Sequence, residues 1–364
     1  MAQYWMVDAL RLTRSGNLME ATASIRKALG MSGTAASVRS GQTEAGVIDL
    51  TSQRGVWRAT AATGDLSSAP TSEGETDRVK EKSRFDEKMY RSTEGSMEYR
   101  LYRPADAAAG MPLVVMLHGC TQSPEDFACG TGMNQLADEF GFLVAYPRQS
   151  ASANAQKCWN WFRPGDQRRD CGEPALLAGI VQDVMTGHKI DASRVYIAGL
   201  SAGGAAAAIM AAEYPDIFAA VGIHSGIACG AARDLPSALS AMKRGSGRRH
   251  SVRADQRFVP VITFHGDYDT TVHEVNSRDI VAAASIVAGV PLSVEVVEGR
   301  STSGRPFTKN SSIDQHGRVL IEQWTIKGSG HAWSGGDPAG TYTDPSGPDA
   351  SREMVRFFLE NALR

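Results

Sequence analysis

The sequence predicts an α/β fold in which a mostly parallel central sheet carries helices on both faces. Short, almost continuous apolar runs recur between residues 112 and 264, and segments with helical patterning lie between most of them. Strands that are buried on both faces have this composition, and their alternation with helices indicates a parallel sheet. Active sites in such sheets form beyond the carboxyl ends of the strands. Polar residues that directly follow a strand are therefore the candidates for a functional site.

The N-terminal part of the chain is predicted to lie outside this sheet. Residues 1–30 have the pattern of two short helices with a break at residues 15–17, which predicts a helical hairpin appendage. Residues 31–83 are rich in Gly, Ser, Thr, Ala and charged groups and lack a sustained period, so we expect a flexible linker there. The α/β catalytic domain is expected over residues 84–364.

Two kinds of strand are predicted in this domain. Residues 85–90 and 96–102 alternate apolar and polar side chains, which is typical of an antiparallel pair. The strands predicted to be buried are residues 112–117, 142–146, 195–198, 218–223 and 260–264, with a late strand at 320–326. Helices are predicted over residues 134–140, 173–189 and 202–214.

Composition excludes several classes of protein. The 364 residues are 42% hydrophobic and 21% charged, which suits a globular protein with a large core. A formal charge of -2 provides no positive field for a nucleic acid, so none is expected as a partner. No apolar run reaches the ~18 residues of a membrane span, and no export signal is recognisable. These features predict a cytoplasmic protein without a membrane span.

Five cysteines are present, an odd number, and their spacing does not resemble a zinc site, so we expect no metal. One or two disulfides can form if the protein reaches an oxidising compartment, and the pairing stays open. The cysteines are Cys120, Cys129, Cys158, Cys171 and Cys229.

The sequence GLSAG at residues 199–203 joins a predicted strand to an alanine-rich helical run. A Gly-x-Ser-x-Gly sequence at such a junction forces the serine into a strained turn with its Oγ exposed. Ser201 is therefore the candidate nucleophile. A serine at this place can also be a simple N-cap. The residues that follow the other strands decide between the two interpretations, because a nucleophile needs a base and an acid nearby.

Ester hydrolysis needs a base, a group that orients the base, and donors for the oxyanion, in addition to the nucleophile. His331, in a glycine-rich loop after the late strand, is the predicted base. Asp269, in the loop that follows residues 260–264, is the predicted orienting acid, with Asp267 as the alternative. The chain order Ser, Asp, His is that of an α/β-hydrolase.

Two backbone amides are predicted to form the oxyanion hole. One belongs to Ala202, directly after the nucleophile, and the other to Cys120, in the loop after residues 112–117. His118 is expected to shape this loop rather than to transfer protons. The predicted chemistry requires no cofactor.

Three tryptophans are predicted to bind substrate. Trp159 and Trp161 lie in a long connection after residues 142–146, and Trp333 is two residues from His331. Loops at this edge of a sheet commonly build the binding cleft. A packing role stays open for each of them, because tryptophan is largely buried in most proteins.

Residues from about 85 to 364 resemble the polyhydroxybutyrate depolymerase-like esterases, a branch of the α/β-hydrolases that includes feruloyl and acetylxylan esterases. The resemblance implies that Asp269, the last residue of His-Gly-x-x-Asp, is the triad acid and that Cys120 supplies an oxyanion amide. The motifs that carry it are LHGCTQ at 117–122, CWNWF at 158–162, GEP at 172–174, GLSAGG at 199–204, HGDYD at 265–269 with Val272, and GHAW at 330–333.

The resemblance also implies an activity, that of a serine esterase working through an acyl-enzyme. The expected substrates are short-chain hydroxyalkanoate oligoesters or polyesters, and the alternative is a feruloyl or acetylxylan type of carbohydrate ester. An acyltransferase, a peptidase with the same triad, or a non-catalytic binding protein on this scaffold stays open. Many relatives are exported, so secretion is the alternative location. The oligomeric state stays open.

Overall fold

The computed structural model describes residues 51–53, 56–58, 83–246 and 257–363. The chain divides into two units, Met1–Thr76 and Asp77–Arg364. In the first unit, β1 (Thr51–Gln53) pairs with β2 (Val56–Arg58) in an antiparallel ladder. The helical hairpin predicted over residues 1–30 and most of the linker predicted over 31–83 lie outside the described residues and stay predictions.

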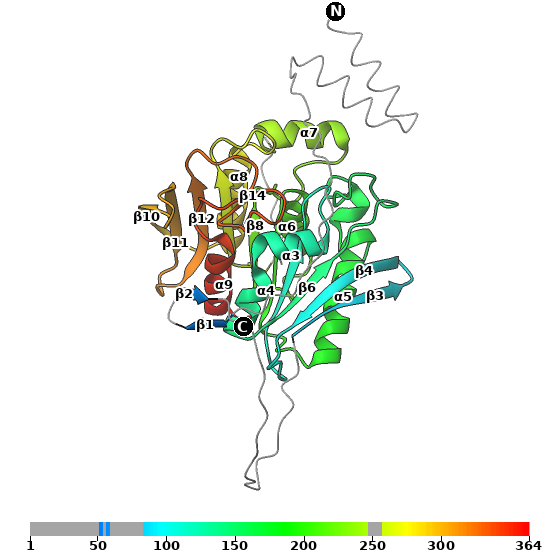
Figure 1. Cartoon of the computed structure of the whole chain (residues 1–364). Helices are drawn as coiled ribbons and strands as arrows, with labels where there is room; N and C mark the ends of the chain where they lie inside the picture. Colours follow the sequence, from blue (N-terminus) through cyan, green and yellow to red (C-terminus); the bar gives the residue numbers. More distant parts are fainter. Residues whose placement is uncertain (1–50, 54–55, 59–82, 247–256, 364) are drawn as a thin grey trace, which may run out of the picture. The chain divides into compact units, whose positions relative to one another are not determined.

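Within the described part of the second unit, ten strands form one sheet in the order β10-β11-β12-β9-β8-β7-β5-β6-β4-β3 (Figure 1). The pairs between β12 and β6 are parallel, and the pairs at both ends of the sheet are antiparallel. The strands are β3 (Arg84–Ser92), β4 (Gly95–Arg103), β5 (Leu113–Leu117), β6 (Leu143–Pro147), β7 (Val195–Leu200), β8 (Ala220–His224), β9 (Val261–Gly266), β10 (Ser293–Arg300), β11 (Pro306–Ile313) and β12 (Val319–Ile326).

The predicted strands are confirmed, with ends that differ by at most two residues. Every residue of β5, β6, β7, β8 and β9 is buried, as expected of parallel strands covered on both faces. The strands β10 and β11 were not predicted. Their side chains are mostly exposed or half-buried, so they form no continuous apolar run in the sequence.

Helices cover both faces of the sheet, and three of them were predicted. These three are α4 (Met133–Phe140), α5 (Gly172–His188) and α6 (Ala202–Glu213). The remaining helices are α3 (Pro124–Thr131), the short 3-10 helix η1 (Pro164–Gln167), α7 (Leu235–Arg244), α8 (Val275–Ala288) and α9 (Ala350–Glu360). A small parallel pair joins β13 (Trp333–Ser334) to β14 (Thr343–Asp344).

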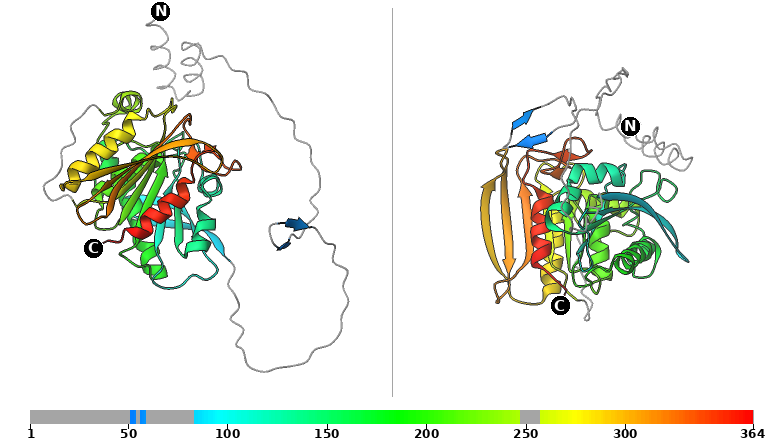
Figure 2. Two further views of the ribbon diagram at one scale, coloured as in Figure 1. Left: turned by 90° about the vertical axis from the view of Figure 1, so that its left-hand side faces the viewer. Right: turned by 60° about the horizontal axis from the view of Figure 1, so that its bottom comes forward.

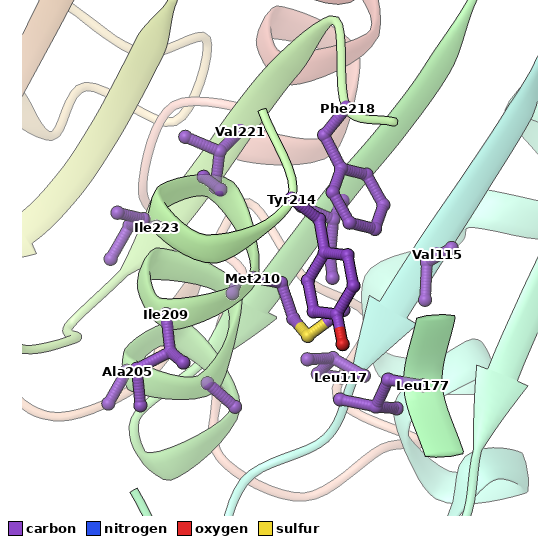
Figure 3. Close-up of a cluster of buried hydrophobic side chains, with 14 of the residues drawn as sticks. Val115, Leu117, Leu177, Ala205, Ile209, Met210, Tyr214, Phe218, Val221 and Ile223 are labelled. Carbon is purple, nitrogen blue, oxygen red and sulfur yellow. The ribbon is translucent and has the colours of Figure 1, made fainter. Parts of the chain in front are cut away.

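The core consists of two apolar layers, one on each face of the sheet. Alternate residues of β5 separate them: Val115 and Leu117 pack with α5 and α6, while Val114 and Met116 pack with α4 and α9. Figure 3 shows the first layer, in which Met210 of α6 and Tyr214, directly after this helix, lie over the sheet. Helix α9 lies against the opposite face (Figure 2).

The parallel arrangement of β5, β7, β8, β9 and β12 brings their carboxyl ends to one edge of the sheet. The loops that carry the predicted site residues therefore meet there, although they are far apart in sequence. Of the helices that the structure describes, none combines the length and apolar character needed to cross a membrane.

Candidate active site

Ser201 lies in the turn between β7 and α6 and has a backbone conformation that side chains rarely adopt. Its φ is 57° and its ψ is -118°. Such a conformation costs ~1–3 kcal/mol in a residue other than glycine, and it persists where the surrounding structure fixes it. The Ser201 amide donates a hydrogen bond to His224 O at 2.9 Å, and its side chain is partly exposed. This is the strained strand-to-helix turn that the GLSAG sequence predicts.

The two glycines of this sequence allow the turn to be this tight. A Cβ on Gly199 would lie 2.4 Å from the carbonyl carbon of Gly203. A Cβ on Gly203 would lie 2.1 Å from Leu117 O, at the end of β5. Both distances are shorter than any van der Waals contact, so these positions exclude a side chain. The glycines thus bring the Ser201 turn against the loop that follows β5.

An acid–base pair lies at the same edge of the sheet. His331 Nδ1 is 2.6 Å from Asp269 Oδ2, and Asp269 Oδ1 accepts hydrogen bonds from the amides of Thr271 and Val272. Burial alone would raise the pKa of Asp269, but the hydrogen bond from His331 and its charge outweigh burial and hold this pKa below its ordinary value. The ionised carboxylate can only accept, so His331 carries a proton on Nδ1 and its Nε2 is available as a base.

Asp267 faces a different part of the chain. It accepts a hydrogen bond from the Gly328 amide at 2.7 Å, and Lys327 Nζ lies 3.7 Å from its other oxygen. A second histidine, His265, also lies close to Asp269, with its Nε2 3.5 Å from Asp269 Oδ2. This nitrogen donates its hydrogen bond to Val272 O at 2.8 Å. Of the two aspartates considered from the sequence, the structure joins Asp269 to His331.

His224 connects the Ser201 turn to the segment that carries His331. Its carbonyl accepts from the Ser201 amide, and its Nε2 accepts from the Ser334 amide at 2.9 Å. Burial lowers the pKa of His224 to about 3, so the ring is neutral and can accept this bond. The described hydrogen bonds do not include one between Ser201 Oγ and His331 Nε2, a contact that is often long in unliganded enzymes.

Residues 118–122, which carry the predicted oxyanion donor Cys120 and are called the oxyanion loop below, lie beside Ser201. A Cβ on Gly119 would be 3.7 Å from Ser201 Cβ. The amides of Gly119 and Thr121 both donate hydrogen bonds, but within the described residues no carbonyl accepts one from the Cys120 amide. Ala202 is the first residue of α6, where N–H groups have no partner inside the helix. Among the described residues, neither predicted oxyanion donor thus has a backbone acceptor.

A disulfide fixes the position of the oxyanion loop. It joins Cys120 to Cys158, which are 38 residues apart in sequence and have a Cα–Cα distance of 4.2 Å. The sequence left the pairing open, because it does not show which loops approach each other. Cys129 and Cys171 carry thiols outside this bond.

The three tryptophans predicted to bind substrate are all buried. Trp159 is 0% exposed and Trp333 is 1% exposed, and their Nε1 atoms donate to His118 O and to Ser351 Oγ, each at 3.0 Å. Trp161, 8% exposed, packs edge-on against Phe162. Side chains without exposed surface cannot touch a ligand in this conformation. The structure therefore argues against direct substrate contact by Trp159 and Trp333.

Next to the oxyanion loop lies an open cavity of about 750 Å³. Three of its lining residues, Thr121, Lys157 and Tyr342, have positive φ values, and Thr121 Oγ1 lies 3.3 Å from Tyr342 OH across it. Strained backbone of this kind gathers at ligand sites. No ligand-binding role was predicted for these residues: Thr121 and Gln122 belong to the LHGCTQ motif, and the other lining residues come together only where separate loops meet. The lining consists of Thr121, Gln122, Ser123, Asp126, Lys157, Thr341 and Tyr342.

In the part of the chain that the structure describes, no group of three or more His, Cys, Asp or Glu residues could hold a metal ion. The buried histidines at this edge are instead held by hydrogen bonds to backbone groups.

The chain is similar to known esterases in sequence and in fold. It is 33% identical over 261 residues to the poly(3-hydroxyalkanoate) depolymerase C of Paucimonas lemoignei, a match that covers 69% of this chain and 60% of that protein's length. It is 30% identical over 217 residues to feruloyl esterase B of Thermothelomyces thermophilus, covering 55% of this chain and 74% of that one. The solved acetyl xylan esterase from Aspergillus awamori shares the fold, with a TM-score of 0.58, 19% identity, and coverage of 72% and 94%.

The sequence also matches a family model over most of the predicted catalytic domain. The matched segment, residues 97–292, includes the oxyanion loop, the Ser201 turn and Asp269. It accounts for more than half of the 364 residues. The chain therefore belongs to the Esterase PHB depolymerase family.

Proposed function

We propose that this protein is a serine esterase that hydrolyses carboxylic esters through an acyl-enzyme. The observation that carries the proposal is the 2.6 Å hydrogen bond between His331 and Asp269 at the sheet edge where the strained Ser201 turn lies. A positioned base and an accessible serine are what activation of a hydroxyl nucleophile requires, and Ser201 is partly exposed. The family membership supports the same chemistry.

In the first half-reaction, Ser201 Oγ attacks the carbonyl carbon of the ester while His331 Nε2 takes the hydroxyl proton. The amides of Cys120 and Ala202 donate to the oxyanion that forms. The tetrahedral intermediate collapses, the bond to the alcohol oxygen breaks, and His331 gives its proton to the leaving alcohol. The product of this step is an ester between the acyl group and Ser201.

In the second half-reaction, a water molecule attacks the acyl-enzyme, and His331 again takes the proton. Collapse of the second intermediate returns that proton to Ser201 Oγ and releases the carboxylic acid. Asp269 stays ionised throughout and stabilises the imidazolium of His331. The low pKa of Asp269 supports this role, because a neutral acid would lose that stabilisation.

The substrates we propose are short-chain hydroxyalkanoate oligoesters or polyesters. The similarity to a poly(3-hydroxyalkanoate) depolymerase supports this class. The alternative is a carbohydrate ester, supported by the similarity to feruloyl esterase B and to proteins named as probable acetylxylan esterases. The cavity beside the oxyanion loop does not distinguish the two classes, because its lining carries only hydroxyl, amide and charged groups that suit either ester.

The decisive test of the activity is the variant Ser201→Ala. We expect wild-type protein to hydrolyse p-nitrophenyl butyrate and to be labelled at Ser201 by a fluorophosphonate, and the variant to do neither while remaining folded. Retained turnover by a folded variant would contradict the proposal. An unlabelled, inactive wild type would indicate a binding protein, and a product formed only with an added alcohol would indicate an acyltransferase.

The substrate class is tested by comparing kcat/KM across 3-hydroxybutyrate oligomers, feruloyl esters, acetylated xylan and an aromatic polyester. A clear preference for the oligomers supports the main proposal, and a preference for feruloyl or acetyl sugars supports the alternative. The wild type and the Ser201→Ala variant are measured side by side, so that turnover from contaminants is subtracted.

The Cys120–Cys158 disulfide supports an oxidising compartment as the place of action. This favours secretion over the cytoplasmic location that the sequence alone suggests. Mass spectrometry after alkylation, applied separately to the cytoplasmic and exported fractions of the source cells, would test it. Finding the protein only in the cytoplasm with both thiols alkylated would contradict secretion.

A further inference from the structure

A buried carboxylate lies behind the oxyanion loop and is not used by the proposed mechanism. Glu173, in the first turn of α5, is 8% exposed. Its Oε1 accepts from Gln149 Nε2 at 2.5 Å and from Asn160 Nδ2 at 2.6 Å, and its Oε2 accepts from the Asn160 amide at 2.8 Å. Among the described residues no Lys, Arg or His forms an ion pair with it. Three N–H donors thus offset part of the cost of burying this charge.

The first connection from Glu173 to the oxyanion hole runs through Gln149. The Gln149 amide donates to His118 Nε2 at 3.1 Å, so this nitrogen carries no proton. The proton of the neutral ring is then on Nδ1, which donates to Gly119 O at 2.7 Å. Gly119 C=O and Cys120 N–H belong to one planar peptide group. A hydrogen bond to that carbonyl fixes the plane and polarises the N–H that faces the oxyanion.

The second connection runs through residues 158–160. Asn160 is held by two hydrogen bonds to Glu173, and Cys158 O accepts from Gln149 Nε2 at 3.1 Å. Trp159, between them, donates to His118 O. Cys158 is bonded to Cys120 itself. The oxyanion loop is therefore held in two ways, through the His118 ring and through residues 158–160. Both contacts depend on Gln149 or Asn160, which Glu173 holds.

We propose that Glu173 is a positioning residue of the oxyanion hole, whose carboxylate fixes Gln149 and Asn160 and, through them, the peptide group that presents the Cys120 amide. The inference rests on the proposed esterase function, because only a reaction with an oxyanion uses that amide. Glu173 touches no reacting atom. It acts through the two connections described above.

The hydrogen-bond donors around Glu173 favour an ionised carboxylate, whereas burial favours the neutral acid and raises the pKa of Glu173. All three partners of Glu173 are N–H donors, and an ionised carboxylate only accepts. A protonated acid would point its O–H at one of these donors and lose that hydrogen bond. The loop would then be held by two bonds in place of three, and the Cys120 amide would be less well fixed.

The experiment compares Glu173→Ala and Glu173→Gln with Glu322→Gln. Glu322 is the matched control, since it is also buried and hydrogen-bonded but pairs with Arg356 and contacts no residue of the site. For each variant, kcat and KM on p-nitrophenyl butyrate, the Ki of a butyryl trifluoromethyl ketone, and the thermal unfolding temperature are measured. The ketone forms a tetrahedral adduct, so its affinity reports on the oxyanion hole directly.

For Glu173→Ala we expect kcat to fall by about 10²-fold with KM unchanged within about twofold, because a displaced oxyanion donor weakens only transition-state binding. The Ki of the ketone should rise by the same factor as kcat falls. Glu173→Gln keeps the size and one acceptor oxygen, so its kcat should lie between those of Glu173→Ala and wild type. Glu322→Gln should lower the unfolding temperature and leave kcat unchanged.

The outcomes separate this inference from the proposed function. A wild type that neither hydrolyses esters nor reacts with a fluorophosphonate refutes the proposed function. An active wild type with a folded Glu173→Gln variant of unchanged kcat and ketone affinity refutes the role of Glu173 alone. The Gln variant decides the question if Glu173→Ala does not fold. A loss that appears only in KM also contradicts the inference.

Discussion

Asp269 accepts a hydrogen bond from His331 at 2.6 Å, whereas Asp267, two residues earlier in the same loop, accepts one from the Gly328 amide. The loop after β9 thus directs two carboxylates to different partners. The amides of Thr271 and Val272 donate hydrogen bonds to Asp269 Oδ1 and so fix the oxygen that does not contact His331. This asymmetry allows the acid of the triad to be tested with a control from the same loop.

We predict that Asp269→Asn lowers kcat by about 10⁴-fold, because an amide at this position no longer stabilises the imidazolium and favours the wrong tautomer of His331. Asp267→Asn should change kcat by no more than about twofold. Steady-state hydrolysis of p-nitrophenyl butyrate measures both. Greater damage from Asp267→Asn would show that the wrong aspartate has been assigned.

Trp159 is predicted to support the oxyanion loop rather than to bind substrate. Its Nε1 donates to His118 O, so Trp159→Phe removes one hydrogen bond of about 1 kcal/mol and should lower kcat by up to about tenfold with little change in KM. Trp324→Phe is the control, because Trp324 is also buried and loses a similar bond, to Glu322. A rise in KM for Trp159→Phe, with kcat intact, would indicate direct substrate contact instead.

Local sequence was sufficient to predict the central strands and the Ser201 turn. In β5 to β9 each residue is buried, so the apolar runs are continuous and the loops that follow them stand out. The turn needs glycine on both sides of Ser201, which leaves a short motif in the sequence. The order of Ser201, Asp269 and His331 then follows from the order of the strands.

The surroundings of these residues could not be predicted, because they depend on contacts between distant loops. Cys120 and Cys158 are 38 residues apart, and no spacing rule selects this pair among five cysteines. An aromatic cluster in a loop suggested a binding surface, but Trp159 turns inward to reach a carbonyl of another loop. The strand β10 forms no continuous apolar run, because glutamates interrupt its exposed valines.

We predict that the double variant Cys120→Ser, Cys158→Ser loses both stability and activity. Closing a loop of this length stabilises a fold by about 4 kcal/mol, so the free energy of unfolding should fall by roughly this amount. The kcat should also fall, because the disulfide holds the residue whose amide faces the oxyanion. Urea unfolding and ester turnover measure the two effects, with Cys129→Ser, an exposed thiol, as the control. Unchanged kcat in the double variant would show that the hydrogen bonds alone hold the loop.

Glu173 should make stability and activity respond to pH in opposite directions. Burial, and then the charge of Asp166, raise the pKa of Glu173 from 4.5 to about 7. Because this folded-state pKa lies above the unfolded one, the stability it contributes is fully present below about pH 4.5 and is lost as the pH rises through about 7. The other titratable group that faces this network, His118, has a pKa lowered by burial to about 4 and stays neutral above pH 5.

The variant Glu173→Gln isolates this effect, since it cannot titrate. The free energy of unfolding of wild type minus that of the variant should decrease by roughly 3 kcal/mol between about pH 5 and pH 8. Over the same interval the ratio of wild-type to variant kcat should rise, because the ionised carboxylate is the form that holds the oxyanion loop. Urea titrations and ester turnover at matched pH values measure the two quantities. A stability difference that does not change with pH would mean that Glu173 does not titrate in this range. A kcat ratio that falls with rising pH would mean that the neutral acid is the form that supports the oxyanion loop.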